Sequence, residues 1–284
     1  MKSLLHLRKL PLLIAVFLTL GNSLPTLAYS PSTNTTELNQ QADLLLARRF
    51  FRRRGRYRVR GRRRAGARRG GCLKDGTKVT PLLPKDPEGS IQDEEIPLTA
   101  EAMTTVFFHV PTKSQNENHP KMKASLLLKE IVAINDRGRR QTEEVFYGYF
   151  ELPEEPGVVG VKIPETEEIA KLQSDRNYVW QVVVFCDPDD SDMARNPNFS
   201  GLIKLETSPE VKAIKKQSLS NQPLAFANEG IWYSALNSLA KLLDSDPNSS
   251  MKQDWQSILQ EVEDGEIADE PFVGFATMIP EDDL

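Results

Sequence analysis

The sequence predicts a mainly β protein with C-terminal α structure: an immunoglobulin-like antiparallel β-sandwich followed by a tetratricopeptide-like helical pair. From residue 79 to 206, β-branched and aromatic runs alternate with segments rich in Pro, Gly, Asn and Asp, as in short strands joined by turns. After Pro209 the apolar residues recur at helical spacing instead. Because most of the strand-like runs have no helical pattern between them, an antiparallel sandwich is favoured over a parallel α/β sheet.

The first 28 residues have the features of an export signal. Basic residues precede the apolar run 10–20, and a small-residue pattern suited to a signal peptidase ends at Ala28. The run contains 11 residues, whereas a membrane-spanning helix needs about 20. We therefore expect residues 1–28 to be removed, no membrane span, and an exported product that lies in the periplasm, in the cell envelope or outside the cell.

Residues 29–71 are predicted to be a disordered basic linker, because they contain too few aliphatic residues to offset the entropy of ordering. We call residues 48–69 the arginine block. It contains 13 arginines and no acidic residue, whereas residues 70–284 contain 20 Lys and Arg against 38 Asp and Glu. A formal net charge of -4 for the whole chain thus conceals a polycation joined to a polyanion. The candidate anion-binding residues are Arg48, Arg49, Arg52, Arg53, Arg54, Arg56, Arg58, Arg60, Arg62, Arg63, Arg64, Arg68 and Arg69.

The arginine block determines which partners we expect. Arginine forks pair bidentately with phosphate, and Arg-Gly repeats interleaved with Tyr57 are typical of tails that bind single-stranded nucleic acid. An exported chain instead meets lipid phosphates, acidic polysaccharides or its own acidic body. An anionic envelope polymer or lipid is therefore the first expected partner and nucleic acid the second. A linker that folds back on the acidic body is the structural alternative.

The expected sandwich occupies residues 72–208. Its candidate strands are 79–83, 105–110, 124–134, 144–151, 158–163, 177–186 and 201–206. In 177–186, apolar residues occupy both faces, which predicts a central strand covered on each side.

Residues 209–264 are the expected helical region. Its two helices are expected at residues 232–243 and 250–262. Phe226, Ala235 and Pro247 match the spacings of a tetratricopeptide repeat, but a second copy of the repeat is missing. Because one such unit cannot bury its own apolar stripe, we expect it to dock on the sandwich or on a protein partner. Residues 265–284 are expected to form an acidic tail.

The sequence does not indicate an enzyme. Without the leader, His109 and His119 are the only histidines, and His109 is expected to be a packed residue of a strand. The chain contains no Gly-x-Ser-x-Gly, His-Glu-x-x-His or Walker-type motif. A hydrolase that uses Asp187 and Asp189 as general acid and base is the remaining catalytic alternative.

Two further features are compatible with the oxidising compartment. Cys72 and Cys186 are either a disulfide or two buried thiols. A loop rich in carboxylates provides oxygen ligands suited to Ca²⁺ as a cofactor, although a solvated turn explains the same residues. The carboxylates are Asp187, Asp189, Asp190 and Asp192.

Several motifs together resemble one family, the domain of unknown function 928, known mainly from cyanobacteria. They are "TVFFHVP" at 105–111, Tyr178-Val179-Trp180 running into Phe185-Cys186-Asp187-Pro188, Asn196-Pro197 followed by Gly201, and "EGIWYSALNSLAKL" at 229–242. The resemblance covers about residues 72–273. It implies a shared fold and compartment and offers no catalytic residues. The leading hypothesis is therefore an exported, non-enzymatic envelope protein with a binding or scaffold role.

Overall fold

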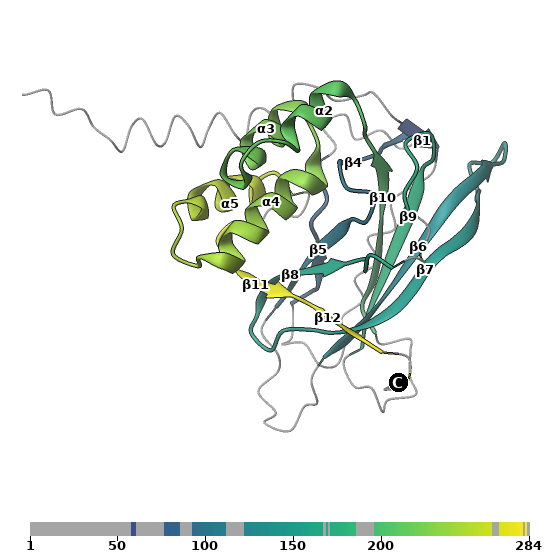
Figure 1. Ribbon diagram of the computed structural model, residues 1–284. Helices are drawn as coiled ribbons and strands as arrows, with labels where there is room; N and C mark the ends of the chain where they lie inside the picture. The colour runs from purple at the N-terminus through teal and green to yellow at the C-terminus, as the bar shows by residue number, and fades with distance from the viewer. Residues whose placement is uncertain are drawn as a thin grey trace, which may run out of the picture. The chain divides into compact units, whose positions relative to one another are not determined.

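A computed structural model of the chain describes residues 58–60, 77–85, 93–111, 122–166, 169, 171–185, 196–262, 267–280 and 282. It is mainly β with helices toward the C-terminus, as the sequence predicted (Figure 1). The strands are β1 (Arg58–Arg60), β2 (Thr80–Pro81), β3 (Asp93–Glu95), β4 (Leu98–Thr99), β5 (Thr105–Val110), β6 (Lys123–Ile134), β7 (Arg140–Glu151), β8 (Gly157–Lys162), β9 (Tyr178–Phe185), β10 (Asn198–Leu205), β11 (Phe272–Phe275) and β12 (Thr277–Ile279). The helices are α2 (Pro209–Ile214), the 3-10 helix η2 (Leu219–Asn221), α3 (Gln222–Glu229), α4 (Trp232–Ser245) and α5 (Met251–Leu259).

The strands form two larger sheets and one small one. The six-stranded sheet has the order β12-β7-β6-β9-β10-β4, and the four-stranded sheet has the order β11-β8-β5-β2. Most neighbours are antiparallel, but β4 and β11 join their sheets in parallel with β10 and β8. A separate antiparallel pair joins β1 to β3.

The four-stranded sheet is the layer that is covered on both faces. All six residues of β5 are buried, and neighbouring residues of a strand point to opposite faces. The Phe108 ring lies 5.2 Å from that of Phe199 in the six-stranded sheet. On the other face, the Phe107 ring lies 6.5 Å from that of Phe272, whose ring in turn lies 5.7 Å from that of Trp255 in α5. The helices therefore cover one face and the six-stranded sheet the other (Figure 1).

Two glycines allow aromatic rings to approach the backbone in this core. A Cβ at Gly160 would lie 2.9 Å from the Phe107 ring and 2.8 Å from the Phe275 ring. One at Gly201 would lie 2.5 Å from the Trp180 ring. Glycine is thus required at both positions for the rings to pack where they do.

The six-stranded sheet buries only one face fully. Tyr178, Trp180, Val182 and Val184 of β9 are buried, whereas the alternate residues are half-buried and Gln181 is exposed. The sequence predicted that β9 is covered on both faces, but only one of its faces is fully buried. By contrast, β5 is buried on both faces along its whole length.

Helix α4 lies at the centre of the helical region. It packs against α3 and α5 and also against β4, β5 and β11, so the helical region docks on the strands, which is one of the two docking positions expected from the sequence. Gly230, with a φ of 73°, ends α3 in the left-handed conformation that favours glycine. None of the helices in the described part of the chain has the length and apolar composition needed to cross a membrane.

The C-terminal segment differs from the expected acidic tail. It forms β11, which extends the four-stranded sheet, and then β12, which extends the six-stranded sheet. The strand residues themselves are mostly apolar, and Phe272 and Phe275 pack against the main core. These two short strands were not predicted from the sequence, because residues 265–284 are rich in acidic residues.

Candidate functional site

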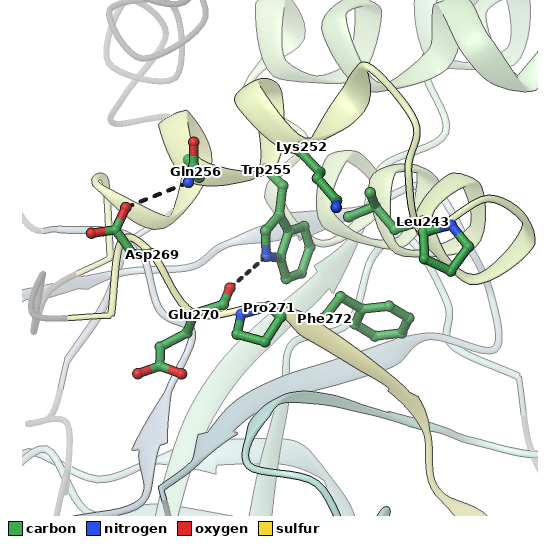
Figure 2. Close-up of a pocket in the computed structure, with 9 residues that line it drawn as sticks. Leu243, Lys252, Trp255, Gln256, Asp269, Glu270, Pro271 and Phe272 are labelled. Carbon is green, nitrogen blue, oxygen red and sulfur yellow. Dashed lines mark hydrogen bonds between the residues drawn. The ribbon is translucent and has the colours of Figure 1, made fainter.

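A pocket of about 320 Å³ lies where the turn between α4 and α5 meets the segment that leads into β11 (Figure 2). Leu243 and Pro247 line it from the end of α4 and the following turn, and Lys252 and Trp255 from α5. Phe272 closes it from the start of β11. The pocket thus combines three segments that are separate in the sequence.

Hydrogen bonds hold the two sides of the pocket together. The Trp255 indole Nε1 donates to the backbone oxygen of Glu270 at 3.0 Å, and Gln256 Nε2 donates to Asp269 Oδ1 at 3.4 Å. Both bonds join α5 to the segment before β11 (Figure 2). Because the only polar group of the indole is used here, Trp255 can offer a ligand only its ring surface.

The chemistry of the pocket suits binding. Its walls are apolar and aromatic, Lys252 provides a cation, and Asp269 and Glu270 provide carboxylates. A few placed charges in an apolar cavity are typical of sites that orient a ligand or a partner side chain. Among the described residues, no group of three or more His, Cys, Asp or Glu side chains is arranged to hold a metal ion.

His109 lies in β5, and its side chain meets that of Glu270. The ring is buried, with 6% of its surface exposed, and Nε2 lies 3.3 Å from Glu270 Oε2. Burial lowers the pKa of His109, and the Glu270 carboxylate opposes this shift. A lowered pKa favours the neutral ring near pH 7, so the contact is a polar one rather than an ion pair. The prediction that His109 is a packed strand residue is confirmed.

A buried polar cluster fastens the start of α4 to β4 and β5. Ser234 Oγ accepts from the Ala100 backbone N–H at 2.7 Å and donates to Glu101 Oε2 at 2.8 Å. Asn237 Nδ2 donates to Glu101 Oε1 at 3.3 Å, and Asn237 Oδ1 accepts from Thr105 Oγ1 at 3.2 Å. A serine next to a carboxylate can be a nucleophile and its base, but Ser234 is fully buried. The cluster positions the helix.

An aromatic group covers part of the outer face of the six-stranded sheet. The Tyr147 and Tyr149 rings lie 5.2 Å apart, Tyr147 Oη donates to Tyr149 Oη at 2.8 Å, and the Tyr149 ring lies 5.9 Å from that of Phe185. Desolvation, and then the hydrogen bond with Tyr149, raise the pKa of Tyr147, so its hydroxyl stays protonated at physiological pH. The alternation of Tyr147 and Tyr149 in 144–151 was the signal that could have revealed this group.

Most of the site residues predicted from the sequence lie outside the described residues. They include the leader, His119, Cys72 and Cys186, and the four carboxylates proposed for Ca²⁺. The disulfide, the calcium site and the carboxylate hydrolase therefore stay predictions.

Of the 13 arginines, Arg58 and Arg60 fall within the described residues, in β1. The antiparallel register places Arg58 opposite Glu95 and Arg60 opposite Asp93. β1 lies inside the segment that was expected to have no regular structure, and its partner strand β3 is entirely acidic.

Together, the fold and the site define a class: a mainly β protein whose C-terminal helices cover one of two principal sheets and contribute a small apolar pocket. The family model for the Domain of Unknown Function (DUF928) matches residues 64–272, well over half of the chain. The chain belongs to this family, which confirms the resemblance inferred from its motifs. A comparison with curated proteins gives no match.

Proposed function

We propose that this is an exported, non-enzymatic protein of the cell envelope that binds an anionic surface through its arginine block. The observation that carries the proposal is the segregation of charge: 13 arginines and no acid in residues 48–69, followed by a strongly acidic body. The leader in residues 1–28 supports export to the periplasm, the envelope or the medium. Lipid phosphates and acidic polysaccharides are the polyanions available there.

The pairing of β1 with β3 supports a block that is partly held by the body. Two of its arginines occupy strand positions that the backbone register places opposite acidic residues of β3. The other eleven arginines of the block lie outside the described residues. A tether requires them to bind an external anion, whereas a self-neutralising linker requires them to bind the acidic body.

The body supplies the scaffold in this proposal. We take the two principal sheets as an immunoglobulin-like sandwich, supported by their opposed aromatic side chains, Phe108 and Phe199. We take the segment from Phe226 to Pro247 as the tetratricopeptide-like unit, supported by the burial of Phe226 and Ala235 in one core. The pocket beside Lys252 and Trp255 is the position that we assign to a protein partner of the helical region.

The test is retention on isolated envelope membranes and cell walls. Deleting residues 48–69 should abolish retention that is sensitive to salt, because screening weakens contacts between exposed charges. A matched variant with all 13 arginines changed to lysine keeps the charge but removes the guanidinium fork. Unchanged retention after the deletion would contradict the tether.

Nucleic acid is the second candidate, because the same Arg-Gly composition suits single strands. Binding of the leaderless chain to single-stranded DNA at physiological salt, together with incomplete export of a reporter fusion, would favour it. Complete export without such binding would remove it.

A further inference from the structure

The β6–β7 hairpin extends beyond the sheet to which it belongs. The last residue of β6 that pairs with β9 is Glu130, opposite Tyr178, whereas β6 and β7 stay paired as far as Ile134 and Arg140. We call residues 131–140 the arm. Its turn lies about 15 Å past the last β6–β9 pair at the usual rise of a strand, and Figure 1 shows the hairpin passing the end of β9.

Hydrogen bonds within the turn of the arm fix its conformation. Asn135 Oδ1 accepts from the backbone N–H groups of Arg137 and Arg139 at 3.0 and 2.9 Å. The Gly138 N–H donates to the Asn135 backbone oxygen at 2.9 Å, and Gly138 has a φ of 73°. An Asn side chain that bonds its own turn, with Gly in the left-handed conformation, fixes the local backbone. The turn therefore presents its arginines from a defined position.

The surface of the arm is both cationic and apolar. Arg137 and Arg139 are exposed, and no carboxylate of the described residues forms an ion pair with either. Two β-branched residues beside them, Val132 and Ile134, are 41% and 37% exposed. Val132 is the extra residue of a β-bulge, where the register shifts between Ile131 and Ala133. Bulges re-aim side chains and bend a strand.

Charge is also graded along the hairpin. Residues 135–140 contain three arginines and one aspartate, whereas Glu143 and Glu144 of β7 and Glu130 of β6 lie nearer the sheet. An anionic surface would attract the turn and repel the base, so the hairpin would meet such a surface with its turn first.

We propose that the arm is a docking element for an anionic lipid surface. Cations attract the headgroups, and exposed apolar side chains next to them can enter the boundary between headgroups and acyl chains, as interfacial elements do. An acidic polysaccharide could bind the arginines, but it has no apolar layer into which the Val132 and Ile134 side chains could insert. This proposal rests on the proposed function, which brings the protein to an anionic surface. It adds that this surface is lipid.

The test is sedimentation with vesicles of phosphatidylglycerol and phosphatidylcholine, compared with phosphatidylcholine alone. The protein is the chain without residues 1–28, with its 13 block arginines either intact or changed to glutamine. In both forms, Arg137→Gln with Arg139→Gln should lower the partition coefficient on anionic vesicles about 25-fold, from about 5-fold for each arginine near such a surface. Lys212→Gln with Lys216→Gln removes the same charge from exposed positions in α2 and in the turn that follows it, and should leave binding near its starting value.

A second variant isolates the apolar contribution. Val132→Ser with Ile134→Ser should lower vesicle binding about 3- to 10-fold without changing its dependence on salt, because apolar contacts are not screened. Circular dichroism checks that each variant is folded. Binding to dextran sulfate should be indifferent to this apolar variant.

The outcomes separate the arm from the arginine block. If the glutamine form of the block loses all vesicle binding and both arm variants match their parents, the arm proposal is wrong while the proposed function stands. If the glutamine form still binds and the arm variants do not, the arm stands and the tether falls. Equal losses from both control and arm arginines, or light scattering that shows a dimer disrupted by the apolar variant, would also overturn the arm proposal.

Discussion

The two principal sheets differ in how much of their surface meets solvent. Although the start of α4 also reaches the six-stranded sheet directly, the four-stranded sheet has helices on one face and the other sheet on the opposite face, so that β5 is buried along its whole length. The six-stranded sheet buries one face, leaves Tyr147 on the other face 45% exposed, and extends into the arm. From this difference we expect side chains between the two sheets to contribute more to stability than side chains on the exposed face of the six-stranded sheet.

The largest expected effect comes from removing a ring between the sheets. Phe108→Ala should lower the free energy of unfolding by about 3–5 kcal/mol, because it leaves a cavity next to Phe199 in a close-packed core. Tyr147→Ala on the outer face should cost less than about 1 kcal/mol, as expected for an exposed position. Urea unfolding of both variants measures the difference. Similar losses would contradict the contrast between the sheets.

A smaller loss is expected from a single hydroxyl that joins α4 to the six-stranded sheet. Tyr233 Oη accepts from Trp180 Nε1 at 2.8 Å and donates to the Leu202 backbone oxygen at 2.9 Å. Tyr233→Phe removes this acceptor from the buried indole N–H and should cost about 1–3 kcal/mol. Denaturant unfolding measures the loss.

The matched control is Tyr149→Phe, which removes a hydroxyl that is bonded to Tyr147 on the outer face. It should change the free energy of unfolding by no more than about 0.5 kcal/mol. If both hydroxyl deletions cost the same, burial is not what makes the α4 bridge important.

The sequence predicted the fold best where burial and strand period agree. For β5 the predicted and observed bounds are the same, because a run of aromatic and β-branched residues ends at Pro111. The exposure of the outer face of β9 was missed, because half-buried Val179 and Val183 look like core residues in the sequence. Periodicity reports which residues share a face, whereas only the fold determines what covers that face.

The candidate site was harder to predict from the sequence than the fold. The pocket joins Trp255 of α5 to Glu270 and Phe272, which belong to a segment whose acidic composition suggested a tail. Short strands such as β11 gain their stability from neighbours in the sheet, and a single sequence does not reveal those neighbours. The arm was not predicted for a related reason. Residues 124–134 and 144–151 were predicted as strands, but the position at which β9 stops pairing with β6 depends on the register between the strands, which a single sequence does not show.

The smallest expected effect lies at the boundary between the covered sheet and the arm. Arg176 Nη1, in the loop before β9, lies 2.8 Å from Glu130 Oε1, at the last β6 residue that pairs with β9. Because the arginine side chain is 48% exposed, a double-mutant cycle with Arg176→Ala and Glu130→Ala should give a coupling energy of about 0.2–1 kcal/mol. The coupling should shrink at ~1 M salt, where the screening length is about 3 Å.

The Lys171–Glu165 pair is the control for this cycle. Its atoms lie 3.6 Å apart, and its side chains are 61% and 69% exposed, so its coupling should be close to zero. If the Arg176–Glu130 coupling is equally small, the ion pair does not hold the arm, and the arm's position depends instead on the backbone bond from the Ile131 N–H to the Asn177 oxygen, 2.8 Å long. A coupling that persists at high salt would place the pair in a drier environment than its exposure indicates, which would extend the covered part of the sheet to the base of the arm.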